Sequence, residues 1–153
     1  MSEHVAEIIW KRETESFAYA DYDRTHAWRF DNGLEVKAAS APAYLGSPSC
    51  VDPEEAFVAS VASCHMLTFL AIASRKRLTV DSYEDKAVGN MEKNEAGKLA
   101  ITRVELNPDI RFAAGVEVDA AALARLHHLS HEECFIANSV KTDIVVNVKE
   151  RSS

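Results

Sequence analysis

The chain has 153 residues, of which 47% are hydrophobic, and this is enough for one domain with one ordinary core. Its formal net charge of -7 provides no basic face, which argues against DNA, RNA or an anionic membrane surface as a partner. The first residues lack the basic end and apolar run of a secretory signal, because Glu3 and Glu7 interrupt them. We therefore expect a single cytoplasmic domain over residues 1–153.

The first third of the chain has the pattern of strands and turns. Rough alternation of aromatic and β-branched residues favours three strands. They are expected at residues 6–10, 17–21 and 27–30. The step Asp31-Asn32-Gly33 tolerates positive φ, so a tight turn should return the chain as a partner strand over residues 34–38. Residues 40–51 are rich in proline, glycine and serine and predict a loop.

A long helix is predicted after this loop. Asp52 is a capping residue, Pro53 suits the first helical position, and Glu55 completes a capping box. The body of the helix, AFVASVASCHMLTFLAIAS, is apolar on nearly every side, as in a helix buried centrally or between subunits. Its length also suits a bilayer span, but its serines, histidine and threonine and the strand-rich remainder favour a soluble protein.

The second half of the chain contains two long strand patterns and a final short one. Residues 79–91 and 98–112 should pair as a hairpin around the polar turn between them. Residues 141–149, rich in valine and isoleucine, predict a closing strand. The sequence therefore predicts an α+β fold, with antiparallel strands, one long buried helix and shorter helices near the end.

Two capping patterns precede those shorter helices. Asp119 is expected to cap a helix over residues 120–129. Ser130 and Glu133 form a capping box that predicts a further helical segment, with Cys134 in its first turn. Backbone N–H groups at such a position stabilise a thiolate, so physical chemistry alone favours Cys134 as the better nucleophile.

The other two cysteines invite plainer interpretations. Cys64 lies in the middle of the apolar helix, roughly 15 Å from its start, where the helix dipole no longer lowers a thiol pKa. From the sequence alone, a small, inert core residue is therefore as good an interpretation of Cys64 as a reactive thiol. Cys50 in the preceding loop is expected to be an incidental free thiol. His65, next to Cys64, is expected to pack or hydrogen-bond elsewhere, because adjacent helical residues point about 100° apart.

Two segments resemble the osmotically inducible protein C and organic hydroperoxide resistance (OsmC/Ohr) family. The helix segment DPEEAFVASVASCHM, residues 52–66, resembles the family's central helix, and HEECFIANS, residues 131–139, resembles its second cysteine segment. The order of elements also fits this family over nearly the whole chain. The resemblance implies an OsmC-like fold, with antiparallel sheets around a long buried central helix, in an intertwined homodimer.

The resemblance also implies a reaction. Cys64 would attack the O–O bond of an organic hydroperoxide and become a sulfenic acid, and Cys134 would resolve it as a disulfide. A cytosolic dithiol would reset the pair, and no metal, flavin or nicotinamide would be required. The resemblance therefore makes Cys64 the nucleophile, whereas the predicted position of Cys134 at the start of a helix favours Cys134.

An arginine and a glutamate complete the site that the resemblance implies. Arg24 is the first choice to stabilise the Cys64 thiolate, with Arg29 as the alternative. Glu54, at the start of the central helix, would hold that arginine in a bidentate contact.

Two other functions remain open on the sequence. His127, His131 and Cys134 have a spacing able to hold zinc or another transition metal, which would make the chain a metal-binding module. A non-catalytic OsmC-like protein, acting in stress or ligand binding, is the other. Four aromatic residues, Trp10, Phe17, Trp28 and Phe30, are expected in the core, or alternatively in the wall of a pocket for an alkyl or lipid hydroperoxide.

Overall fold

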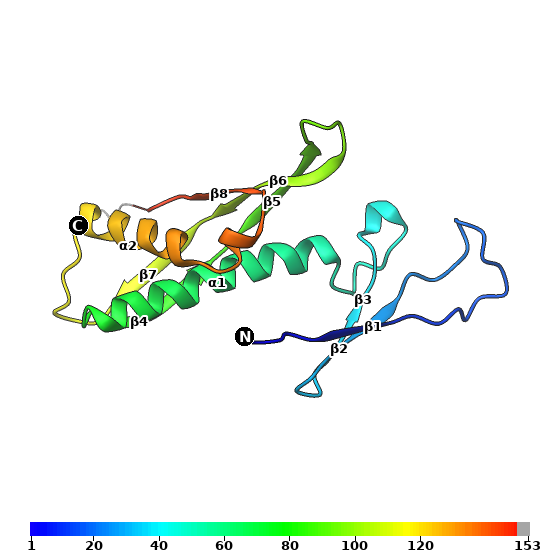
Figure 1. Ribbon diagram of the computed structural model, residues 1–153, viewed down its shortest axis with the longest axis horizontal. Coiled ribbons are helices and arrows are strands. Elements are labelled where there is room, and N and C mark those ends of the chain that lie inside the picture. Colours follow the sequence, from blue (N-terminus) through cyan, green and yellow to red (C-terminus); the bar gives the residue numbers. More distant parts are fainter. Residues whose placement is uncertain (150–153) are drawn as a thin grey trace. The chain divides into compact units, whose positions relative to one another are not determined.

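The structure of this chain is a computed structural model that describes residues 1–149. Its contacts divide the chain into two compact units, Met1–Ala56 and a second unit that begins at Phe57. The boundary falls within the first turn of helix α1 (Pro53–Arg75), the long helix predicted from its capping box. Figure 1 shows the helices and strands of both units.

The first unit contains a three-stranded antiparallel sheet in the order β1-β2-β3. The strands are β1 (Ala6–Ile9), β2 (His26–Phe30) and β3 (Glu35–Ala38). The predicted turn between β2 and β3 is confirmed, with Gly33 at a φ of 83° and the Leu34 N–H donating to Asn32 Oδ1 at 2.9 Å. Glycine suits this position because it reaches positive φ without a steric penalty.

The strand predicted over residues 17–21 is wrong. This segment belongs to a loop between β1 and β2, whose aromatic rings pack on one another instead of alternating across a sheet. The Phe17 ring lies 5.9 Å from that of Trp10 and 5.0 Å from that of Tyr22, measured between centroids. The Trp10 indole N–H also donates to the Asp23 carbonyl at 2.8 Å. Aromatic residues favour strands on average, but here they form a local cluster that closes the loop.

The start of α1 follows the sequence prediction closely. The Glu55 N–H donates to Asp52 Oδ1 at 2.7 Å, and the Asp52 N–H donates back to Glu55 Oε2 at 3.2 Å. The preceding loop contains one short 3-10 helix, η1 (Pro42–Tyr44). Farther along α1, the buried positions follow a four-residue spacing, as expected for one face of a helix. They are Val61, His65, Phe69 and Ala73.

Up to residue 149, the second unit contains five strands in two sheets. A three-stranded sheet has the order β5-β6-β8, and β4 pairs with β7 in a separate two-stranded sheet. The strands are β4 (Val80–Asp85), β5 (Val88–Lys93), β6 (Leu99–Leu106), β7 (Pro108–Phe112) and β8 (Asp143–Val146). The hairpin prediction is confirmed for β5 and β6, but β8 joins β6 in parallel.

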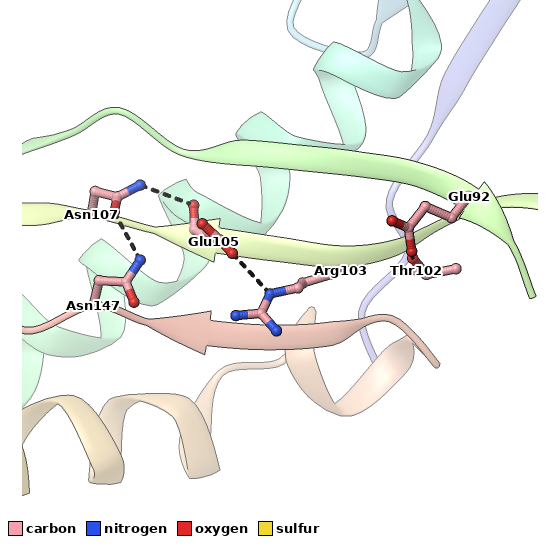
Figure 2. A network of polar contacts seen from close by, with 6 residues as sticks. All are labelled: Glu92, Thr102, Arg103, Glu105, Asn107 and Asn147. Atoms are coloured by element: carbon pink, nitrogen blue, oxygen red, sulfur yellow. Dashed lines mark hydrogen bonds and ion pairs between the residues drawn. The ribbon is translucent and has the colours of Figure 1, made fainter.

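Each of the two long strands predicted from the sequence is in fact divided in two. The division between β6 and β7 falls at Asn107, which makes several hydrogen bonds. Its backbone N–H donates to Asp85 Oδ1 at 2.7 Å, and its side-chain amide donates to the Lys86 carbonyl at 3.0 Å. Figure 2 shows the same side chain accepting a hydrogen bond from the Asn147 amide and contacting Glu105. These bonds satisfy polar groups where the chain leaves one sheet for the other.

Helix α2 (Ala120–Glu133) begins as predicted and then continues past its predicted end. Asp119 caps it, accepting a hydrogen bond from the Ala122 N–H at 2.7 Å. The prediction of a second capping box at Ser130 is wrong, because the Ser130 hydroxyl donates to the Leu126 carbonyl at 2.6 Å within the same helix. Cys134 is consequently the C-terminal cap of α2, followed by the short 3-10 helix η2 (Ala137–Ser139).

Two apolar clusters fix α1 within the second unit. One cluster joins α1 to α2 and to the β4–β7 sheet, and its buried members are Phe69, Ala73, Ile110 and Leu126. The other joins α1 to the β5-β6-β8 sheet, and its buried members are Val61, Val104 and Leu106. Cys64 lies on α1 between Val61 of the second cluster and Phe69 of the first.

Candidate functional site

Cys64 lies in the wall of an open groove in the second unit, with a volume of about 940 Å³. The side chain is partly exposed, so a small molecule in this groove reaches the thiol. The other ten lining residues come from α1, from the C-terminal end of α2 and from the segment just after it, and half of the ten are apolar. They include Leu67, Ala71, Ile72, Leu129 and Phe135. Arg75 and Glu133 are the charged residues of this lining.

Cys134 is buried beside Cys64. Only 1% of Cys134 is exposed, and its thiol is close enough to Cys64 for each to affect the ionisation of the other. Burial, and after it the neighbouring Cys64 thiol, raise the pKa of the Cys134 thiol to about 11, although the Ala137 N–H donates to its sulfur at 3.4 Å. The structure thus brings together the two cysteines singled out from the sequence.

The pKa argument that favoured Cys134 as nucleophile is therefore wrong. It assumed that Cys134 opens a helix, where backbone N–H groups and the positive end of the dipole stabilise a thiolate. Cys134 instead ends a helix and is buried, and both conditions favour the neutral thiol. Of the two adjacent thiols, Cys64 is the accessible one.

Arg24 and Glu54 lie together in the first unit. Both line a pocket of about 540 Å³ whose other walls are largely aromatic. These walls include Ile8, Trp10, Phe17, Tyr22 and Tyr44. The alternative that Trp10 and Phe17 line a pocket, instead of a closed core, is the one the structure supports: Trp10 is 41% exposed and Phe17 63%.

The Arg24 guanidinium is held within this pocket by the loop that precedes β2. It donates to the Tyr22 carbonyl at 2.8 Å, and it also donates to the Tyr19 carbonyl. The guanidinium carbon, Cζ, lies 4.0 Å from the centroid of the Tyr22 ring and 4.8 Å from that of the Tyr19 ring, in cation–π contacts. Among the described residues no ion pair joins Arg24 to Glu54, so the bidentate contact expected between them is not formed in the single chain.

The alternative arginine is engaged elsewhere. Arg29 lies on β2, and its guanidinium pairs with Glu35 at 3.2 Å and with Glu7 at 3.6 Å on an exposed surface. Cys50 lies in the loop before α1, in the first unit, and belongs to neither the thiol pair nor the aromatic pocket.

A buried histidine pair lies on the helices that carry the thiols, and sequence reasoning missed it. His65 of α1 and His127 of α2 are 1% and 2% exposed, and a hydrogen bond of 3.1 Å joins His65 Nε2 to His127 Nδ1. Burial and then the neighbouring histidines lower the pKa of His65 to about 4, and burial lowers the pKa of His127 to about 4. The two residues are 62 positions apart, so no local pattern signals the pairing.

The zinc-site alternative is not supported by this geometry. Within residues 1–149, no group of three or more histidine, cysteine or acidic side chains is placed to hold a metal ion. His127, which the spacing assigned to the metal, is instead paired with His65. We therefore set the metal-binding module aside.

Comparison with known proteins assigns the chain to a family. The family model described as OsmC-like protein matches residues 46–149, which is more than half of the chain. The chain belongs to the OsmC-like family. An OsmC-like protein of unknown function from Vibrio cholerae is 46% identical, over 96% of this chain and 99% of its own, with a TM-score of 0.92. No curated protein matches the chain.

More distant OsmC-like structures share the fold. An organic hydroperoxide resistance protein OsmC from Legionella pneumophila is 18% identical over 95% of this chain and 96% of its own, with a TM-score of 0.68. The organic hydroperoxide resistance protein OhrB of Bacillus subtilis is 19% identical over 95% of this chain and 98% of its own, with a TM-score of 0.67. The family therefore includes hydroperoxide resistance proteins, although these identities show only the fold for this chain.

The fold also decides how the apolar helix is interpreted. By length and composition alone, α1 is long and apolar enough to cross a membrane. The match to the Vibrio cholerae structure identifies it as the core helix of the OsmC-like fold. The α+β fold with several antiparallel sheets, predicted from the sequence, is confirmed by the same match.

Proposed function

We propose that this OsmC-like protein is a cytoplasmic, two-cysteine peroxidase that reduces organic hydroperoxides in defence against oxidative stress. The observation that carries the proposal is the pair of neighbouring free thiols, one lining a groove and the other buried. An accessible thiol next to a protected one is the arrangement that a peroxidatic and a resolving cysteine require. The hydroperoxide resistance proteins among its relatives support the choice of substrate.

The proposed reaction has two chemical steps before the reset. The Cys64 sulfur attacks one peroxide oxygen, the O–O bond breaks, and Cys64 becomes a sulfenic acid while the alcohol leaves with the thiol proton. The Cys134 sulfur then attacks the Cys64 sulfur, an S–S bond forms, and the S–O bond breaks to release water. A cytosolic dithiol returns two electrons and two protons through thiol–disulfide exchange. All electrons come from thiols, so the scheme requires no cofactor.

Arg24 is the proposed support for the Cys64 thiolate, with Glu54 as its partner. Arg24 is preferred over Arg29 because Arg29 is already paired with two glutamates on the surface. Its guanidinium is partly buried in an aromatic pocket that also contains Glu54, where a positive charge is screened less than on the surface. In this proposal, Arg24 and Glu54 form their bidentate contact in the assembled homodimer.

Cysteine variants treated with cumene hydroperoxide test the assignment. The fully reduced protein should lose two thiols per peroxide, with a Cys64–Cys134 crosslink found by mass spectrometry after proteolysis. Cys64→Ser should abolish peroxide consumption. Cys134→Ser should allow one turnover, followed by oxidation of Cys64 to sulfinic acid, because nothing captures the sulfenic acid. Cys50→Ser is the matched control and should behave as the wild type.

Two results would contradict the proposal. Full peroxidase activity in Cys64→Ser would remove Cys64 as the reacting residue. No reaction of the wild type, or oxidation scattered among all three cysteines, would favour a non-catalytic OsmC-like protein acting in stress or ligand binding.

A further inference from the structure

The His65–His127 pair joins the two helices that carry the reactive thiols. His65 follows Cys64 on α1, and His127 lies seven residues before Cys134 on α2. Seven residues are about two helical turns, so His127 and Cys134 lie on the same face of α2. Figure 1 shows α2 running back along α1, and the shared apolar cluster confirms that they pack together.

This pair is an unusual choice for a buried helix contact. Besides the hydrogen bond between the rings, His65 Nδ1 and His127 Nε2 are buried, and neither has a hydrogen-bond partner in the described chain. Burying unpaired polar nitrogens opposes folding, and two apolar side chains of similar volume would avoid that penalty. A contribution to stability therefore does not account for the pair.

A hydrogen bond differs from an apolar contact in being directional. The two rings are stacked, with centroids 5.4 Å apart and an angle of 9° between their planes, and the His127 ring also packs on Phe69. Apolar contacts such as Phe69 with Leu126 tolerate small sliding of one helix along the other, whereas the Nε2–Nδ1 bond fixes one position. Disulfide formation has a narrow tolerance, because the two Cβ atoms must approach to about 3.5–4.5 Å.

We propose that the buried His65–His127 hydrogen bond is a positioning device that holds Cys134 of α2 against Cys64 of α1 for disulfide formation. His65 and His127 are positioning residues in this scheme and do not touch the peroxide. The step they serve is the attack of the Cys134 sulfur on the Cys64 sulfenic acid, which forms the S–S bond and releases water. The inference rests on the proposed function for its peroxide chemistry, but thiol proximity is measurable without peroxide.

The matched variants are His127→Asn and His127→Gln. Both place an amide at position 127, but only asparagine places its polar atoms near the site of Nδ1, where His65 Nε2 is bonded. His127→Leu removes the bond altogether. His128→Leu is the control, because His128 is a neighbouring histidine whose exposed ring pairs with Glu132 at 3.3 Å.

Two measurements separate this inference from the proposed function. The first is the equilibrium of the Cys64–Cys134 disulfide with reduced and oxidised glutathione, which reports the effective concentration of the two thiols. The second follows treatment with cumene hydroperoxide and measures the ratio of disulfide to Cys64 sulfinic acid by mass spectrometry. Equilibrium unfolding in urea is measured for every variant, so that a difference in stability is recognised.

The expected result is a difference between the amide variants. His127→Gln and His127→Leu should lower the effective concentration of the two thiols at least tenfold. They should also raise the fraction of Cys64 found as sulfinic acid, while Cys64 reacts with peroxide at the wild-type rate. His127→Asn should remain within about threefold of the wild type, and His128→Leu should equal it. If His127→Leu fails to fold, the two amide variants still decide the question.

Equal behaviour of His127→Asn and His127→Gln in glutathione overturns the positioning inference, as does wild-type closure of the disulfide in His127→Leu. A wild type that forms the disulfide with glutathione but ignores peroxide overturns the peroxidase proposal alone. In that case the difference between asparagine and glutamine in glutathione still supports the positioning role.

Discussion

The two thiols of the candidate site differ in exposure and in the charge that they tolerate. Cys134 is 1% exposed, and burial raises the pKa of its thiol to about 11, whereas Cys64 opens on the groove. At pH 7, four units below this pKa, only about one Cys134 thiol in ten thousand is ionised. Cys134 is thus protected from peroxide at neutral pH and available only to the sulfur beside it.

This protection predicts the alkylation behaviour of the reduced protein. Iodoacetamide should modify Cys134 far more slowly than Cys50 at pH 8, and the Cys134 rate should rise about tenfold per pH unit until about pH 11. Quenched aliquots analysed by mass spectrometry give the rate at each residue. In concentrated guanidinium chloride the Cys134 profile should move to the ordinary thiol range, near pH 8.5. Rapid alkylation of native Cys134 at pH 8 would contradict its burial.

The histidine pair makes the stability of the protein depend on pH. An unfolded histidine takes up its proton near pH 6.5, whereas burial lowers the pKa of His65 and of His127 to about 4 in the folded chain. Between these values the unfolded state binds more protons, so folding stability rises with pH. The free-energy cost of keeping both rings neutral in the folded chain is absent above pH 6.5 and grows as the pH falls towards 4.

We accordingly expect the free energy of unfolding to fall between pH 6.5 and pH 5, by up to about 1.4 kcal/mol per pH unit for each histidine. Urea unfolding over this window measures the slope, and most carboxylates do not titrate there. His127→Leu should reduce the slope by about half, because one of the two titrating groups is gone. A wild-type stability that is flat over this window would show that the rings are not held neutral.

At the scale of the elements, helix starts were predictable and longer-range features were not. Asp52 and Asp119 cap their helices as predicted, because a cap depends on residues three positions apart. Ser130 has the same local pattern, yet its hydroxyl bonds back to Leu126, because α2 continues to pack against α1. The break at Asn107 depends on partners more than 20 residues away.

In the candidate site, too, local features could be predicted from the sequence and features that depend on tertiary packing could not. Cys64, Cys134, Arg24 and Glu54 were all found through local motifs and family resemblance, and the structure places each thiol and each charged residue within a pocket or a pair. The burial and raised pKa of Cys134 were missed, because they depend on how α2 packs. His65 was expected only to pack or bond elsewhere, and its partner His127 emerges from the tertiary fold alone.

One close approach between elements accounts for a glycine in a strand. A Cβ added at Gly89 of β5 would lie 2.5 Å from a methyl carbon of Val58 on α1, closer than real Cβ contacts allow. The bare backbone at Gly89 therefore lets β5 approach the helix. Gly97 differs, because it has a φ of 73° in the hairpin turn and open space around it.

We expect Gly89→Ala to destabilise the protein by about 1–3 kcal/mol, the usual range for overpacking. Adding Val58→Ala should recover most of that loss, because the colliding methyl group is gone. Urea unfolding of the two single variants and the double variant measures the coupling energy. Gly97→Ala is the control: its loss comes from backbone strain and should not couple to Val58. Additive behaviour of Gly89→Ala and Val58→Ala would show that this contact is not the cause.

At the scale of the whole molecule, the single chain leaves much apolar surface uncovered. Only four of the 23 residues of α1 are buried, although the helix is apolar along most of its length. Leu67 of α1 is 59% exposed and Phe135 is 82% exposed, and both line the groove that contains Cys64. Large exposed apolar side chains that share one groove are a feature of interaction surfaces. In the homodimer that we propose, a second copy of the chain would cover this surface.

The homodimer leads to a test with two matched leucines. We expect the wild type to sediment as a dimer and Leu67→Glu to sediment as a monomer, because a carboxylate buried at the interface without a partner weakens association by several kcal/mol. Leu99 is 60% exposed, equivalent to Leu67, but it lies at the start of β6, outside the groove lining. Leu99→Glu should therefore remain a dimer. A monomeric wild type would remove the dimer from the proposal, whereas a dimeric Leu67→Glu would move the interface away from the groove. If the prediction holds, the open side of the Cys64 groove faces the second subunit, and the peroxide binds where the two chains meet.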